Sequence, residues 1–235
     1  MYGIYSYPFH VEKDGITIDI NEKNGIYHYI RECCGRKFET LISASNGRIH
    51  INPVEPVNLP KSITRFLEID FERILISPDS EDKYYLTFPV DIGIFLEIGN
   101  DIEVVDIFSL TNIKYSLYGS PTEGEIVRYY KCSINKEIPK TDCSREGIIE
   151  LEINNSDSKI ASVSKSVYDS YGMKLYYDKE LVSMTAHMKI YQKNIATTEF
   201  LNIPVRSGMS KSIELYLSRN LSAIKKYYMM EWGFD

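Results

Sequence analysis

The stretch 117–133, LYGSPTEGEIVRYYKCS, holds the side chains of this chain best suited to grip a ligand. Arg128 shares a strand face with Ile126 and Tyr130, because alternate residues of a β-strand point the same way. An arginine in that apolar setting usually has a carboxylate partner or a stacked ring. It could hold an anionic ligand, or form a structural ion pair with Glu123 or another acid. The structural pair is the favoured interpretation.

The residues around Pro121 predict a hairpin turn in this stretch. Pro121 presets its own φ, and Gly124 is expected to supply a positive φ. The ligand-binding hypothesis for the hairpin comprises Tyr118, Glu123, Glu125, Arg128 and Tyr130.

A second candidate is the acidic row Glu68, Asp70 and Glu72 within LEIDFE (67–72). Side chains at i and i+2 of a strand start roughly 7 Å apart. This separation lies within the range found between the two catalytic carboxyl groups of inverting glycosidases. A solvated strand face that discourages aggregation explains the same row, and it is the favoured interpretation. The catalytic alternative is a hydrolase of carbohydrates or phosphoesters, with carboxylates such as Glu68, Asp70, Glu123 or Glu125 as acid and base.

Tyrosine is unusually frequent, with 19 Tyr against 9 Phe and a single Trp. In a strand, each pair of adjacent tyrosines gives one ring to the core and one to the outside. An outward ring suits stacking on a sugar or covering a partner surface, although ordinary β-propensity explains the same residues. The pairs are Tyr84-Tyr85, Tyr129-Tyr130, Tyr176-Tyr177 and Tyr227-Tyr228.

Familiar catalytic and cofactor motifs are absent from the sequence, which contains no GxGxxG, P-loop, GxSxG, HExxH or EF-hand pattern. The four histidines stand far apart, so we predict neither a metal site nor a cofactor. The four cysteines contain no CxxC pair. Each is expected to be a reduced, buried structural residue.

The charge and hydropathy of the chain disfavour nucleic-acid binding and membrane insertion. A net charge of −6 and a pI of about 5.4 disfavour nucleic-acid binding, which needs a basic field. No run of about 18 apolar residues exists to span a membrane. The N-terminus, MYGIYSYPFHVEKDG, lacks the basic and apolar regions of a signal peptide. We therefore expect a cytoplasmic protein.

Alternation with a period of two recurs along the chain and predicts strands. It is clear at 15–20, 25–33 and 48–51, and at 67–72, where Leu67, Ile69 and Phe71 are expected to face inward. Asn24-Gly25 and Asn46-Gly47 suit tight hairpin turns. Short connections without intervening helices favour antiparallel pairing.

The expected fold is mainly β, either an antiparallel β-sandwich or two packed β lobes with one C-terminal helix. The helix is expected over 220–233, where Leu221, Ile224, Tyr228 and Trp232 recur at helical spacing. We expect a single β-rich domain over 1–235, with a lobe boundary near 109–125, because all-β domains often reach this length.

The segment KYSLYGSPTEGEIVRYYKCS, with the opening MYG and the later MKLYYD and AHMKI, resembles an archaeal family of uncharacterised proteins. The family is the domain of unknown function numbered four-three-two, and the resemblance spans the whole chain. That family carries no assigned activity, so the resemblance transfers no catalytic residues. It implies a compact cytoplasmic protein.

The sequence thus predicts a non-catalytic binding or interaction module. It would recognise a small anionic or carbohydrate-like ligand, or a protein partner, through exposed tyrosines and the 118–130 hairpin. A homo-oligomer is compatible with this reading. The hydrolase alternative would instead require carboxylates that converge in a pocket, at least one with a shifted pKa.

Overall fold

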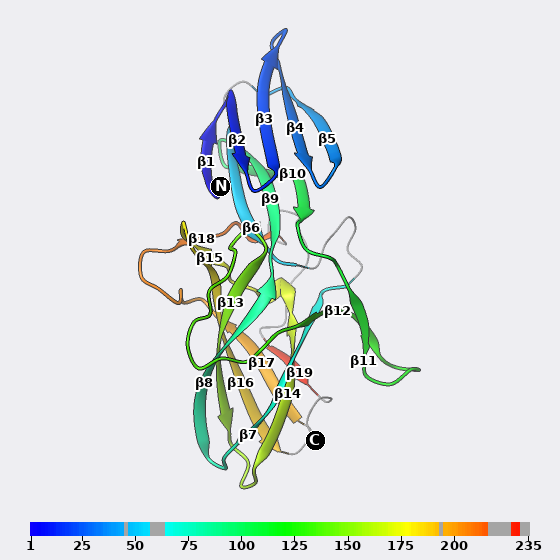
Figure 1. Ribbon diagram of the computed structural model, residues 1–235, viewed down its shortest axis with the longest axis vertical. Helices are drawn as coiled ribbons and strands as arrows, with labels where there is room; N and C mark the ends of the chain where they lie inside the picture. Colours follow the sequence, from blue (N-terminus) through cyan, green and yellow to red (C-terminus); the bar gives the residue numbers. More distant parts are fainter. Residues whose placement is uncertain (45–46, 57–63, 193–194, 216–226, 231–235) are drawn as a thin grey trace.

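The computed structural model describes residues 1–44, 47–56, 64–192, 195–215 and 227–230 (Figure 1). Nearly all regular structure in these ranges is β-strand, as the alternating pattern predicts. The strands form an elongated molecule with an upper and a lower lobe, stacked end to end in Figure 1. Each lobe is a pair of facing sheets.

The upper lobe contains sheets A and B. Sheet A has the strand order β1 (Gly3–Ser6), β6 (Arg48–Val54), β9 (Asp91–Ile98) and β10 (Asp101–Ser109). Sheet B is an antiparallel meander of β2 (Phe9–Lys13), β3 (Ile16–Lys23), β4 (Ile26–Cys33) and β5 (Arg36–Ile42).

The lower lobe contains sheets C and D. Sheet C has the order β11 (Tyr115–Tyr118), β12 (Glu125–Lys131), β7 (Phe66–Ile76) and β14 (Ala161–Asp169). Sheet D has the order β18 (Ser210–Lys211), β15 (Tyr176–Tyr177), β16 (Val182–Gln192), β13 (Glu146–Asn155) and β8 (Ser80–Pro89). β17 (Ile195–Leu201) also pairs with β16, β19 (Tyr227–Met230) pairs with β17, and one 3-10 turn, η1, covers Ser170–Gly172.

The two lobes have separate apolar cores, each filled from the inward faces of its sheets. In the upper lobe, Ile18 of sheet B and Ile94 of sheet A belong to one fully buried cluster. In the lower lobe, Leu67, Ile69 and Phe71 lie inside, as predicted, in a cluster with residues of sheet D. Burial of such aliphatic side chains contributes roughly 1.5–3 kcal/mol each.

The β3–β4 hairpin confirms the turn prediction at Asn24-Gly25. Asn24 has φ 57° and Gly25 has φ 77°, the left-handed values that a type I′ turn requires. Lys23 and Ile26 pair directly on either side of the two turn residues. The second predicted turn includes Asn46, which lies outside the described residues.

The predicted antiparallel pairing is confirmed for most neighbouring strands of the described residues, but it fails at two pairs. β12 runs parallel to β7, and β13 runs parallel to β16. In both cases the chain passes through other strands before it returns, which gives the long connection that parallel pairing needs.

The predicted helix over 220–233 is not observed. Its residues 227–230 form β19 against β17, and the rest of the range lies outside the described residues. Pairing with the edge of sheet D overrides the helical spacing, because tertiary context outweighs local propensity.

A buried ion pair joins the two lobes. β8 in the lower lobe and β9 in the upper lobe are separated by one residue, so Asp91 lies where the chain crosses. Arg128 of β12 donates from Nη1 to Asp91 Oδ2 at 2.7 Å and from Nη2 to Oδ1 at 3.1 Å. Their side chains are 2% and 0% exposed. The acid partner that the sequence favoured for Arg128 is therefore Asp91.

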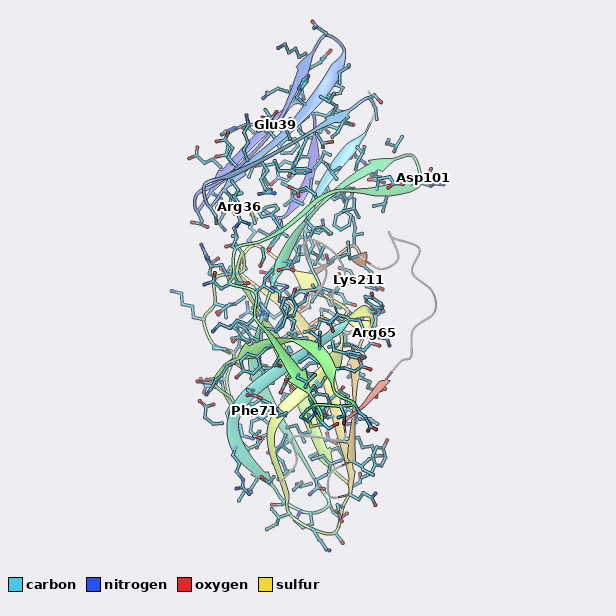
Figure 2. The ribbon with its side chains drawn as sticks, turned by 90° about the vertical axis from the view of Figure 1, so that its right-hand side faces the viewer. Arg36, Glu39, Arg65, Phe71, Asp101 and Lys211 are labelled. Atoms are coloured by element: carbon cyan, nitrogen blue, oxygen red, sulfur yellow. The ribbon has the colours of Figure 1, made fainter. Side chains whose placement is uncertain are left out.

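The segment before Leu215 makes a second contact between the lobes. Asn52 Oδ1 accepts a hydrogen bond from the backbone N–H of Ile213 at 3.1 Å. The carboxyl group of Glu55 accepts one from the N–H of Leu215 at 3.3 Å. Lys211, in β18 at the start of this segment, lies at mid-height between the lobes in Figure 2. These bonds hold the segment against the end of β6.

Glu55 is fully buried, and burial raises its pKa to about 8. Glu214 lies near enough to raise this pKa further, while Lys174 lowers it. Glu214 itself accepts from Lys174 at 2.5 Å and lies 2.7 Å from Lys211 Nζ. Glu55 is therefore protonated in the folded protein at neutral pH.

We predict that Asp91→Asn destabilises the protein by about 3–5 kcal/mol, because it leaves the Arg128 guanidinium buried without a countercharge. Urea denaturation measures the free energy of unfolding. The double variant Asp91→Leu/Arg128→Met, which removes both charges, should recover most of the loss. Glu39→Gln, at an exposed ion pair with Lys37, is the control and should change little. A loss for Asp91→Asn no larger than that of the control contradicts this role.

Glu55 predicts a pH dependence of stability. Between its unfolded pKa, roughly 4.3, and its folded pKa of about 8, the folded protein holds a proton that the unfolded chain releases. Its contribution to stability is therefore greatest at low pH and is lost as pH rises from about 5 to about 8. Glu55→Gln should flatten this fall, measured as unfolding free energy at pH 5.5 and 8.5. Equal falls in the variant and the original protein would refute the assignment.

Candidate functional site

The candidate site is the β11–β12 hairpin, which projects from the side of the molecule in Figure 1. Leu117 lies opposite Ile126, and Tyr118 lies opposite Glu125. The N–H of Gly124 donates to the carbonyl of Ser120 at 2.7 Å and closes the turn.

The glycines of this turn have different roles from those predicted. The positive φ of 106° belongs to Gly119, whereas Gly124 is needed for space. A Cβ on Gly124 would lie 2.5 Å from the carbonyl oxygen of Ser120, closer than real side chains approach.

Three of the five predicted ligand residues lie inside or beside the lower core: Arg128 and Tyr130 toward the base of the hairpin, and Tyr118 next to its turn, opposite Glu125. Arg128 is paired with Asp91, as described above. Tyr118 is 6% exposed and belongs to the lower core. The hydroxyl of Tyr130 donates to Glu146 Oε1 at 2.5 Å.

The remaining two, Glu123 and Glu125, lie at the far end of the hairpin and are exposed. The backbone N–H of Glu123 donates to the hydroxyl of Ser120 at 3.1 Å, so its carboxylate is not needed to hold the turn. The five predicted residues are divided between the interior of the lower lobe and the exposed end of the hairpin.

An exposed apolar face on the hairpin was not predicted. Tyr115, Leu117 and Ile126 are 39%, 48% and 54% exposed. The register places all three on the same side, because Leu117 pairs with Ile126 and Tyr115 with Arg128. Alternation in the sequence shows which residues share a face, but not whether another element covers that face.

The outer edge of β11 is open within the described part of the chain, where β12 is its one neighbour. The N–H of Tyr129 donates to the carbonyl of Lys114 at 2.9 Å. In an antiparallel pair the bonded residues alternate, so the backbone groups of Tyr115 and Leu117 point away from β12.

This edge lacks the charged side chains that guard the outer edges of other sheets. β5 carries exposed Arg36 and Glu39, both labelled in Figure 2, and β10 carries exposed Asp101 and Glu103. Charges on an edge strand discourage pairing with another chain. β11, with the sequence YSLY, has none.

Two members of the acidic row on β7, Glu68 and Asp70, support the hairpin instead of forming the predicted solvated face, whereas Glu72 is exposed as predicted. Glu68 is 3% exposed. It accepts from the hydroxyl of Ser116 at 2.8 Å and from Lys165 Nζ at 2.6 Å. Asp70 accepts from the hydroxyl of Tyr129 at 3.0 Å. These bonds tie β11 and β12 to the body of sheet C.

A different carboxylate pair lies on the outer face of sheet D. Glu81 and Glu152 share a hydrogen bond, which lowers the pKa of Glu81 and raises that of Glu152. Split pKa values are the mark of an acid–base pair. Glu81 is exposed on the sheet surface, however, and an exposed pair lacks the surrounding walls that catalysis uses. This arrangement does not favour the hydrolase alternative.

Several outward tyrosines have hydroxyls that are already bonded to acids. The Tyr85 hydroxyl donates to Glu150 at 3.0 Å, as Tyr129 does to Asp70.

The four cysteines are free thiols, as expected, but Cys34 is exposed at a turn where we predicted burial. It lies in the connection between β4 and β5, where its φ is 52°.

The described residues form neither a metal-binding cluster nor a membrane-spanning helix. No group of three or more His, Cys, Asp or Glu side chains in those residues is arranged to hold a metal ion. No helix among them has the length and hydrophobicity needed to cross a bilayer.

Comparisons with known proteins agree with the resemblance seen in the sequence. A family model described as "Protein of unknown function (DUF432)" matches residues 1–231. Neither the curated proteins nor the solved structures contain a match to this chain. Because the family match covers nearly all 235 residues, the chain belongs to the DUF432 family.

Proposed function

We propose that this protein is a non-catalytic interaction module that associates with a second copy of itself through the β11–β12 hairpin. The observation that carries the proposal is the exposed apolar face of Tyr115, Leu117 and Ile126 beside an unguarded strand edge. An open edge and adjacent apolar side chains are the two components of recognition by strand addition.

The hairpin can pair with its own copy by a two-fold axis perpendicular to the sheet. Two β11 strands would then lie antiparallel, and the outward backbone groups of Tyr115 and Leu117 on each would find partners. The apolar faces of the two hairpins would join into one continuous surface. Such an interface uses the same patch on both subunits, as most dimers do.

Charge at the two ends of the hairpin supports the antiparallel arrangement. Exposed Lys114 stands at the base, whereas exposed Glu123 and Glu125 stand at the far end. Lys114 and Tyr118 lie four residues apart in the strand and face the same way. Tyr118 pairs with Glu125, so Lys114 and Glu125 share a face. Antiparallel copies would bring each lysine toward the acids of the other subunit.

The base of the hairpin is held before any partner arrives. The Arg128–Asp91 pair fixes β12, and the Ser116–Glu68 bond fixes β11. A surface that is already ordered loses less conformational freedom on binding. Rigidity at the base therefore favours association of this short edge.

We predict a concentration-dependent dimer with a dissociation constant on the order of 1–100 µM, the weak range expected of a small interface. Sedimentation equilibrium measures it. Leu117→Lys should weaken association at least about tenfold, because it places a charge in the apolar contact. Leu75→Lys is the matched control, since Leu75 is 64% exposed on β7. A monomer at all concentrations, or equal effects of both lysines, contradicts the proposal.

A charge swap tests the orientation of the two copies. Lys114→Glu should weaken the dimer, and the double variant Lys114→Glu/Glu125→Lys should restore it if base and far end face each other. Failure of the double variant to restore association would exclude the antiparallel arrangement while leaving the role of Leu117 to its own test.

A further inference from the structure

A cleft of about 450 Å³ lies among connections of the lower lobe, and no residue of the β11–β12 hairpin lines it. Three connections of the chain line it: residues 138–141 before β13, Glu180 and Leu181 before β16, and Arg206 after β17. Its volume lies within the range of small-molecule sites, roughly 300–1,000 Å³.

The turn that carries Glu180 and Leu181 is fixed by a single acid. Asp178 Oδ1 accepts the backbone N–H groups of Glu180 at 2.7 Å and of Leu181 at 2.8 Å. The backbone N–H of Asp178 also donates to the carbonyl of Leu181 at 2.9 Å. The carboxylate of Asp178 therefore serves to hold this wall in place.

The opposite wall, residues 138–141, is fixed at both ends. Before it, Asn135 and Tyr85 exchange two backbone hydrogen bonds of 2.8 and 3.0 Å. After it, Asp142 Oδ1 accepts the N–H of Ser144 at 3.0 Å. A cleft whose walls are already held is suited to binding without large rearrangement.

The charged groups at the cleft are mainly positive, although the whole chain is acidic. Lys140 is exposed and forms no ion pair within the described residues. Arg206 lies 3.8 Å from Glu180, a carboxylate that is 84% exposed, and such a long surface contact is weak. Both cations are available to an incoming anion.

The other lining residues supply apolar surface and one free hydroxyl. Ile138, Pro139 and Leu181 form the apolar part. Thr141 Oγ1 is enclosed and has no hydrogen-bond partner in the described structure. Rotation of this hydroxyl toward a ligand would break no existing bond, and an unpaired buried hydroxyl is itself unfavourable.

We propose that this cleft binds a small organic phosphate monoester. The planar guanidinium of Arg206 and the ammonium of Lys140 match the charge and the several acceptor oxygens of a phosphate. The carbon chain of the ester would lie on Ile138, Pro139 and Leu181. The site is separate from the proposed dimer contact, so either proposal can fail without the other.

Isothermal titration of the full chain with n-butyl phosphate and with inorganic phosphate tests the site. The butyl ester should bind at least about tenfold more tightly than inorganic phosphate, the gain expected for roughly two buried methylene groups. Butanol alone should not bind measurably. Equal affinity for the ester and for inorganic phosphate would overturn the assigned role of the apolar surface.

Substitutions at exposed positions separate the site from general electrostatics without threatening the fold. Lys140→Gln and Arg206→Gln should each weaken binding of the butyl ester at least about fivefold, and Arg206→Lys should fall between. Lys159→Gln makes the same charge change at an exposed position beyond the far end of β13 and should leave affinity unchanged. The proposal is overturned if the ester does not bind or if Lys159→Gln weakens it equally.

Discussion

The ion pair of Arg128 and Asp91 is the interaction on which the arrangement of this protein depends. Neither side chain has access to water, so each charge is tolerable only while the other is in place. Asp91 begins β9 in the upper lobe, and Arg128 lies in β12 of the lower lobe. The pair therefore fixes the lobes to each other and, through β12, fixes the direction in which the β11–β12 hairpin projects.

Two further buried acidic residues also fix how the elements are oriented, because apolar packing alone does not set a direction. In the upper lobe, Asp106 of β10 accepts from Arg31 Nε at 2.6 Å and from the hydroxyl of Tyr29 at 3.0 Å, which joins its two sheets. At the junction, Glu55 holds the N–H of Leu215. The aliphatic cores supply most of the driving force, whereas these polar contacts select one geometry. A rigid frame of this kind suits the proposed role of presenting a strand edge to a second copy.

The sequence predicted what depends on neighbouring residues and missed what depends on distant ones. Asn24-Gly25 sets its own turn, and the alternation around Ile69 identifies its inward face, so both were predictable. Asp91 stands 37 residues before Arg128, and its role appears only once the chain crosses between the lobes. The exposed face of Leu117 was likewise missed, because periodicity does not reveal which face another sheet covers. The helix over 220–233 failed at 227–230 for a related reason: the open edge of β17 offers pairing that spacing cannot show.

Amide hydrogen exchange at low and high protein concentration tests the account most directly. In the single chain, the outward N–H groups of Tyr115 and Leu117 have no strand to bond within the described structure, whereas alternate residues of β11 already bond to β12. Pairing of two β11 edges predicts that exchange at Tyr115 and Leu117 slows as concentration rises, with little change at Ser116. Exchange at both residues that stays fast and independent of concentration would contradict the proposed edge.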